Sequence, residues 1–259
     1  MSTREQIEVI AQAGFDFCEL PAKAVQPFEE DAAALPALRS LGTAPLRPEA
    51  FNVLVPPQLP LVGAKRDVTA LRTYLRRAFR RMVQLGASVA VFGSGGARRL
   101  PEDMPRQAAL DQLAESISVI ADEADRVGLQ IALEPLNRNE CNVLNTLSEA
   151  QAFIDVYDLA GARLLVDLFH LQMEQEPLAH VTVAAPLLAH VHVAGGGRRA
   201  PHIPGCDYAG FMAALHEAGY DARISAECAW EDLSLQAGDA VAFMRSFDVH
   251  STTDSLPVE

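Results

Sequence analysis

Cysteine is scarce in this sequence, and the four that occur form no close pair. They are Cys18, Cys141, Cys206 and Cys228, and no CxxC motif is present. Four widely spaced cysteines in a chain of 259 residues do not form the pattern of a disulfide scaffold. The cysteine content therefore favours a reducing compartment, and we expect a cytoplasmic protein.

Long apolar runs are also absent. No uninterrupted apolar stretch reaches the roughly 18 residues that a membrane-spanning helix requires. The first residues, MSTREQIEVIAQAG, carry Arg4 and Glu5 ahead of an amphipathic pattern and contain no apolar signal-peptide core. We therefore expect neither a secretory signal nor a transmembrane helix.

Basic residues are outnumbered, with 21 Lys and Arg against 34 Asp and Glu, which gives a formal net charge of −13. Affinity for phosphate backbones and anionic lipids comes largely from cationic side chains, so this composition disfavours nucleic acid and membrane partners. No linker or low-complexity segment divides the chain. We expect one domain over residues 1–249, followed by a flexible polar tail at 250–259.

Helical and extended patterns alternate along the whole sequence. Apolar periodicity predicts helices at residues 3–13, 28–41, 67–85, 106–127, 148–158, 176–185, 207–218 and 238–247. Short apolar runs between them predict strands at residues 15–20, 51–55, 87–92, 129–133, 163–168, 188–194 and 223–226. This alternation indicates parallel βαβ units and an α/β fold. Because the chain opens on a helix, the predicted architecture is a TIM (β/α)8-type barrel that lacks its first β-strand.

Four consecutive predicted strands end in a carboxylate or an imidazole. These side chains belong to Glu134, Asp167, His192 and Glu227. Strand ends of this kind converge on the active-site mouth of a barrel. Buried carboxylates are costly unless they are paired or bind a metal, so a set of four is difficult to assign to stability alone.

Three carboxylates and one imidazole offer mostly hard oxygen ligands. Such a set suits Mn²⁺, Mg²⁺ or Co²⁺ better than a structural Zn²⁺. Its open positions would accept two neighbouring oxygens of a polyol or hydroxyketone. The metal would then polarise the carbonyl and stabilise the enediolate that forms when the adjacent carbon loses a proton.

Four segments carry a resemblance to a known family: LEPLNRNECNVLNT (133–146), LLVDLFHLQMEQE (164–176), HVHVAGGGRRAPHIPG (190–205) and ISAEC (224–228). With these motifs the chain resembles the sugar phosphate isomerase/epimerase superfamily of xylose isomerase-like TIM barrels, and in particular ketose 3-epimerases of the D-tagatose and D-psicose type. The resemblance extends over almost the whole chain, from FDFCELP onward.

The resemblance implies a complete site. Glu134, Asp167, His192 and Glu227 would bind the divalent metal, with Mn²⁺ favoured and Mg²⁺, Co²⁺ or Zn²⁺ as alternatives. Glu134 and Glu227 would also be the catalytic acid/base pair, one on each face of the substrate. Further substrate contacts would be made by Glu140, His170 and Arg198. The implied reaction is C3 epimerisation of a ketose by a homodimeric or homotetrameric enzyme.

Other activities stay open at the sequence level. Hydroxypyruvate isomerase and inosose isomerase or dehydratase use related barrels, and delivery of the proton to the neighbouring carbon would give aldose–ketose isomerisation. An endonuclease-IV-like enzyme would need more metal ligands and a cationic groove, which the net charge disfavours. A non-catalytic sugar-binding protein is the third class, and the intact Glu134 and Glu227 argue against it.

Several polar residues have no assigned role at this stage. Glu19 ends the first predicted strand, where it would reach the pocket or pair with an arginine. We expect His190, two residues before His192, to lie deeper in the barrel with a hydrogen-bonded ring. The Gly93–Gly96 loop, followed by Arg98 and Arg99, is a weak candidate for a phosphate-binding turn. The long loop after Arg198 leaves open an exchange of roles with Arg199.

Overall fold

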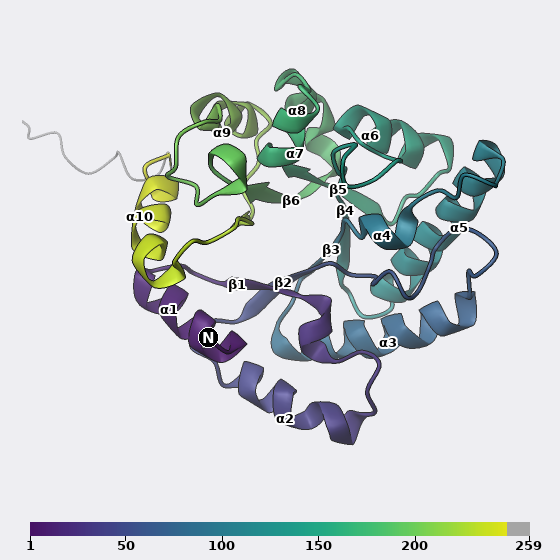
Figure 1. Cartoon of the computed structure of the whole chain (residues 1–259), viewed down its shortest axis with the longest axis horizontal. Coiled ribbons are helices and arrows are strands. Elements are labelled where there is room, and N and C mark those ends of the chain that lie inside the picture. The colour runs from purple at the N-terminus through teal and green to yellow at the C-terminus, as the bar shows by residue number, and fades with distance from the viewer. Residues whose placement is uncertain (248–259) are drawn as a thin grey trace, which may run out of the picture.

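The computed structural model describes residues 1–247, which form a barrel of seven parallel strands surrounded by helices (Figure 1). The strands pair in the order of the sequence, each with the next. They are β1 (Cys18–Pro21), β2 (Pro48–Asn52), β3 (Val89–Phe92), β4 (Gln130–Leu133), β5 (Ala162–Asp167), β6 (Leu188–Val193) and β7 (Ile224–Ala226). The predicted α/β barrel without a first strand is therefore confirmed. The predicted tail at 250–259 and the last two residues of the predicted domain lie outside the described residues.

Helices connect successive strands and cover the outer face of the barrel (Figure 1). They are α1 (Thr3–Ala13), α2 (Asp31–Gly42), α3 (Val68–Leu85), α4 (Gly95–Arg98), α5 (Arg106–Asp125), α6 (Leu147–Val156), α7 (Leu168–Met173), α8 (Ala179–Ala184), α9 (Tyr208–Glu217) and α10 (Leu233–Arg245). In the described residues, no helix combines the length and apolarity needed to cross a membrane.

Side-chain capping explains where several of the helices begin. Ser2 and Glu5 form a capping box at the start of α1, in which the Ser2 hydroxyl accepts from the Glu5 amide and the Glu5 carboxylate accepts from the Ser2 amide. The α10 helix begins five residues earlier than predicted, because the Asp232 carboxylate accepts hydrogen bonds from the amides of Ser234 and Leu235.

Other elements also depart from their predicted ranges: β1 begins at Cys18 rather than at residue 15, and α2 begins at Asp31 rather than at residue 28. The second strand occupies Pro48–Asn52 rather than 51–55, because its pairing with β1 begins at the Cys18–Pro48 pair. Apolar residues 53–55 follow the strand as a loop. Two short helices were not predicted: α4 begins at Gly95 within the glycine-rich segment, and α7 begins directly after Asp167.

Apolar side chains form two separate clusters. The larger cluster lies between the sheet and the helices and includes Phe51, Phe79 and Phe92. The smaller cluster, which includes Val91, Ala132 and Leu165, lies inside the barrel. Because side chains alternate between the two faces of a strand, the residues two positions farther along these strands also face inward. Two positions beyond Ala132 and Leu165 lie Glu134 and Asp167, which are polar residues of the candidate site.

The barrel is not closed by pairing between β1 and β7 within residues 1–247, although α1 and α10 pack side by side over this region (Figure 1). A cavity of about 240 Å³ lies between the two edge strands. Its lining includes Cys18, Glu19 and Leu20 of β1 and residues 224–226 of β7. We call this region, defined by residues 18–20 and 224–226, the β1–β7 seam.

Candidate metal centre

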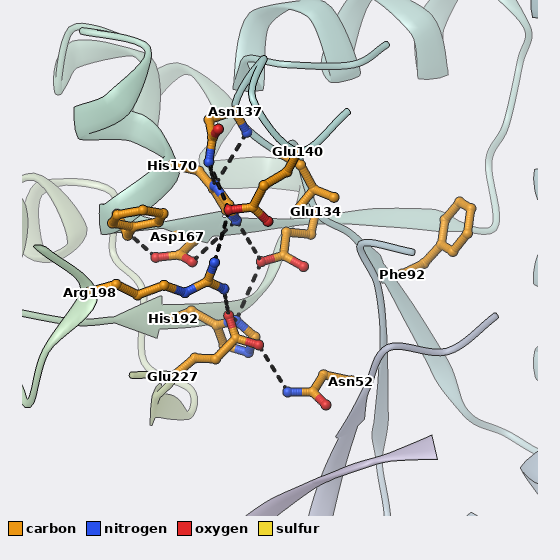
Figure 2. A network of polar contacts seen from close by, with 12 residues as sticks. Asn52, Phe92, Glu134, Asn137, Glu140, Asp167, His170, His192, Arg198 and Glu227 are labelled. Atoms are coloured by element: carbon orange, nitrogen blue, oxygen red, sulfur yellow. Dashed lines mark hydrogen bonds and ion pairs between the residues drawn. The ribbon is translucent and has the colours of Figure 1, made fainter. Parts of the chain in front are cut away.

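Four side chains from four successive strand ends meet at the mouth of the barrel (Figure 2). One ligand atom from each of Glu134, Asp167, His192 and Glu227 lies within 4.8 Å of every other. Asp167 and His192 are partners in the pairing of β5 with β6, while Glu134 and Glu227 directly follow β4 and β7. The structure thus brings together all four residues proposed as metal ligands from the sequence.

Three buried atoms of this centre have no hydrogen-bond partner among residues 1–247. They are Glu134 Oε1, Asp167 Oδ2 and His192 Nδ1. His192 Nδ1 lies 3.5 Å from both Glu134 Oε1 and Glu227 Oε2. Buried polar atoms without partners are costly, and a divalent cation among them would satisfy all three. Three carboxylates with one imidazole also match the ligand preferences of Mn²⁺, Mg²⁺ and Co²⁺, so the residues present fit such an ion.

The carboxylates of the centre repel one another and are buried. Burial, together with the charges of Glu227 and Glu134, raises the pKa of Asp167 to about 8. Burial and the charge of Glu227 also raise the pKa of Glu134. For Glu227 the upward effect of burial is outweighed by His192 and Arg198, which lower its pKa to about 2. Burial disfavours the charged form of His192, but Glu19 and Glu227 raise its pKa well above the ordinary value. The centre therefore holds exchangeable protons that a cation would displace.

His170 presents one ring nitrogen to this centre. Its Nδ1 accepts a hydrogen bond from the backbone amide of Asn137 at 3.2 Å, so the ring proton lies on Nε2. His170 Nε2 faces Glu134 Oε1 and Asp167 Oδ2, each at 3.7 Å, and has no hydrogen-bond partner in the described part of the chain. Burial and the charge of Arg198 lower the pKa of His170 to about 3, which keeps the ring neutral. His170 is therefore a neutral donor aimed into the centre.

The position of His170 follows from its spacing to Asp167. Asp167 Oδ1 accepts from the amide of Phe169 at 2.8 Å and thereby begins α7. Three residues make about one helical turn, so His170 lies on the same side of α7 as Asp167. One oxygen of Asp167 thus organises the helix, while the other faces the centre.

Arg198 crosses the mouth above the centre (Figure 2). Its guanidinium donates to Glu227 Oε2 at 2.6 Å and to Glu140 Oε1 at 3.0 Å, and it lies over the Phe169 ring at 4.9 Å. Arg199 instead donates to the carbonyl of Gly196. All three side chains proposed as substrate contacts, Glu140, His170 and Arg198, therefore border the four-residue centre, and Arg199 does not take the place of Arg198.

The glycine-rich turn after β3 makes room for Glu134. A Cβ on Gly93 would lie 2.2 Å from Glu134 Oε2. Arg98 is fully buried, and its guanidinium donates to the carbonyls of Phe92 and Leu144. A buried guanidinium with carbonyl partners is not available to an incoming phosphate group. The phosphate-binding hypothesis for this loop is therefore wrong for Arg98, and the turn serves the packing of Glu134.

Three polar residues of the site had no role assigned from the sequence. Asn52 donates to Glu227 Oε1 at 3.0 Å, Asn137 orients His170 and donates to Glu140, and Glu19 contacts His190 and His192. Asn52 was placed inside the predicted strand, whereas it ends β2. Its alternation with Ala50 was the signal that both face inward. Asn137 lies in a loop, where its residue type alone carries no signal.

Comparison with known proteins places this geometry in a family. The family model described as the xylose isomerase-like TIM barrel matches residues 7–247. A D-psicose 3-epimerase of Agrobacterium fabrum is 28% identical over 209 residues, which cover 75% of this chain and 68% of that protein. A putative hydroxypyruvate isomerase of Streptomyces coelicolor is 34% identical over 139 residues, covering 50% of this chain and 47% of that protein.

Solved structures show the same architecture. The crystal structure of a D-allulose 3-epimerase from Methylomonas sp. superposes with a TM-score of 0.80 at 25% identity, covering 95% of this chain and 91% of that one. The match of the family model over nearly all described residues is decisive. This chain belongs to the xylose isomerase-like TIM barrel family.

Proposed function

We propose that this protein is a divalent-metal-dependent sugar epimerase that inverts C3 of a ketose by proton transfer next to the carbonyl. The observation that carries the proposal is the convergence of Glu134, Asp167, His192 and Glu227 within 4.8 Å. The names of the curated relatives, which include D-psicose and ketose 3-epimerases, support a sugar epimerase or isomerase. The metal dependence, the proton-transfer mechanism, the ketose and the stereocentre are proposed here beyond that similarity.

Glu134, Asp167, His192 and Glu227 would hold the cation. A cation held there would supply positive charge that stabilises negative charge developing on the substrate oxygens. Manganese is the ion we favour, with magnesium, cobalt and zinc as alternatives for the same ligands.

Proton transfer falls to the two glutamates. They come from β4 and β7 and flank His192 Nδ1, so each would face one side of a substrate placed between them. One carboxylate removes the proton from C3 and the other, in its protonated form, delivers a proton to the opposite face. This exchange inverts C3 and leaves the two glutamates with their protonation states reversed. Exchange with solvent then resets the pair.

The neighbouring side chains would orient the substrate. His170 Nε2 is a neutral donor with no partner of its own, so it can donate to a substrate hydroxyl or carbonyl oxygen. Arg198 and Glu140 form a donor and acceptor pair at the mouth, and substrate hydroxyls would exchange with the contact between them. We expect Arg198→Ala to raise KM for ketoses about tenfold, from the loss of a charge-assisted hydrogen bond.

Solvent-deuterium incorporation tests the proposed reaction. Purified protein loaded with Mn²⁺ is incubated in D2O with a panel of ketoses, and the products are analysed by NMR. A two-base epimerase places one deuterium at C3 of each inverted molecule. Removal of the metal with EDTA is expected to stop the exchange, and added Mn²⁺ to restore it. No deuterium incorporation with any ketose in the panel would refute the proposal.

Hydroxypyruvate isomerase activity is the second candidate, supported by the similarity to the Streptomyces coelicolor protein. It differs in the carbon that receives the proton, so the same glutamates would serve. Hydroxypyruvate is therefore included in the panel, and exchange with it alone would favour this candidate. The net charge of −13 continues to disfavour an endonuclease-IV-like reaction on DNA. An inosose is included as a test of the remaining related activities.

A further inference from the structure

Glu19 is a buried carboxylate outside the four-residue centre. Its side chain lies on β1, is only 7% exposed and points into the barrel. Its two oxygens contact two different imidazoles, with Oε2 lying 2.8 Å from His190 Nε2 and Oε1 lying 2.9 Å from His192 Nε2. No arginine or lysine among residues 1–247 forms an ion pair with it. The arginine partner considered from the sequence is therefore not found within these residues.

The contact with Glu19 determines which nitrogen of His192 is free. A carboxylate only accepts hydrogen bonds, so the His192 ring must donate through Nε2. In the neutral ring Nδ1 then carries the lone pair, and this is the atom that lies 3.5 Å from Glu134 Oε1 and Glu227 Oε2. The opposite tautomer would place a proton where the cation ligand is needed.

His190 completes the arrangement from one layer deeper. Its Nε2 lies 2.8 Å from Glu19 Oε2 and 3.0 Å from Ser225 Oγ, and its ring stands edge-on to that of His192. The second oxygen of Glu19 is thereby held, which fixes the plane of the carboxylate that faces His192. His190 is fully buried and directs no atom toward Glu134 or Glu227 in the contacts found.

We propose that Glu19 is a positioning residue that sets the tautomer and orientation of His192 for cation binding. The inference rests on the proposed function, because it requires a cation at the four-residue centre. Partners of this kind around a ligating histidine typically change metal affinity by about 10- to 100-fold when they are removed. Glu19, His190 and His192 could alternatively bind a second cation, since their ligand atoms also lie within 4.8 Å of one another.

Metal affinity and stoichiometry test the proposal directly. Titrations of the metal-free full-length protein with Co²⁺, in competition with a chelator, give the dissociation constant, and the visible spectrum of bound Co²⁺ reports its ligand geometry. We expect one equivalent of Co²⁺ in the wild type. Glu19→Leu is expected to weaken binding about 10- to 100-fold and to change the spectrum. Glu19→Gln, whose amide oxygen can still accept from His192, is expected to restore most of the affinity.

A matched control separates positioning from a general loss of stability. Glu123 on α5 is a second buried carboxylate, which forms ion pairs with Arg72, Arg76 and Arg126 and none with the centre among residues 1–247. Glu123→Leu is expected to lower the melting temperature and leave the Co²⁺ dissociation constant unchanged. If Glu19 positions His192, Glu19→Leu should instead weaken Co²⁺ binding strongly and change the melting temperature less than Glu123→Leu does.

The outcomes distinguish this inference from the proposed function. Failure of the wild type to bind Co²⁺, Mn²⁺ or Mg²⁺ would refute both. Wild-type binding with an unchanged Co²⁺ affinity and spectrum in Glu19→Leu would refute only the role of Glu19. Two equivalents in the wild type, with one lost in Glu19→Leu, would show that Glu19 is a ligand of a second cation and would also overturn the proposal.

Discussion

The two halves of the barrel contribute to the site in different ways. Strands β4 to β7 supply the four candidate ligands, which come from consecutive strand ends. Strands β1 to β3 supply none of them, but they provide a hydrogen bond from Asn52, space at Gly93 and a contact from Glu19. These residues of the first half therefore act on the candidate ligands of the second half, by contacting them or by leaving room for them. This difference teaches that strand-end chemistry alone underestimates the extent of a site.

The largest expected effect comes from the ligand-bearing half. Glu134→Gln and Glu227→Gln remove the groups proposed to move the proton, so each is expected to lower deuterium incorporation at C3 by about 10³-fold. Glu231→Gln, an exposed glutamate four residues beyond Glu227, serves as the control and should retain activity. Wild-type rates in either active-site variant would remove that glutamate from the acid/base pair.

The next prediction tests whether the first half of the barrel contributes by leaving room for a ligand side chain of the second half. Gly93→Ala places a Cβ against Glu134 Oε2 and should displace the carboxylate, and a displacement of about 1 Å can cost about 10²-fold in rate. The Gly238→Ala variant on α10, where an added Cβ meets nothing within 4 Å, is the matched control and should be neutral or slightly stabilising. Both are measured by deuterium incorporation and thermal unfolding. Equal activity of the two variants would contradict the role assigned to Gly93.

The pH dependence of metal affinity reports the protons that the ligand side chains carry in the metal-free protein. Asp167 has a pKa of about 8 and His192 a pKa well above its ordinary value, so both hold protons in the metal-free protein near neutral pH. Cation binding must release them, so affinity is expected to rise as pH increases. Below pH 8 each released proton gives about a tenfold gain per pH unit. Calorimetry in buffers of different ionisation enthalpy counts these protons, and an affinity independent of pH between 6 and 8 would contradict the prediction.

The smallest effect concerns a single neutral hydrogen bond from the first half. Asn52→Ala removes the donor to Glu227 Oε1, while Arg198 still donates to Oε2. A loss of about 1 kcal/mol corresponds to about a fivefold decrease in kcat/KM. Steady-state kinetics of the variant check this value. A decrease as large as that of Glu227→Gln would mean that Asn52 contacts the substrate itself.

The same division explains what the sequence allowed us to predict. The ligand-bearing half was predictable because carboxylates and imidazoles interrupt strands that are otherwise apolar, as in the run Leu164–Asp167. The bounds of α1 and α3 followed from apolar periodicity, and the structure adds the capping side chains of Ser2 and Asp67 at their starts. The boundaries of β2 did not follow, since its register depends on pairing with β1 and its apolar run continues past the strand.

The supporting residues escaped prediction for a different reason. Glu19 and His192 are separated by 173 positions in the sequence, and only the closure of the barrel brings them within hydrogen-bond distance. The role of Gly93 depends on the absence of a side chain and on a neighbour 41 positions away, so no local pattern records it. Contacts across the barrel interior form only when the whole sheet assembles, so the sequence pattern of one strand does not reveal them.

The β1–β7 seam has a consequence for how cation binding affects the sheet. β1 and β7 are edge strands that do not pair with each other within residues 1–247, and the 240 Å³ cavity lies between them. Glu19 lines that cavity and also contacts His192, so a cation held at the mouth would tie the two sides of the seam together. Hydrogen exchange should therefore show the amides of β1 and β7 becoming more protected when the ion is added.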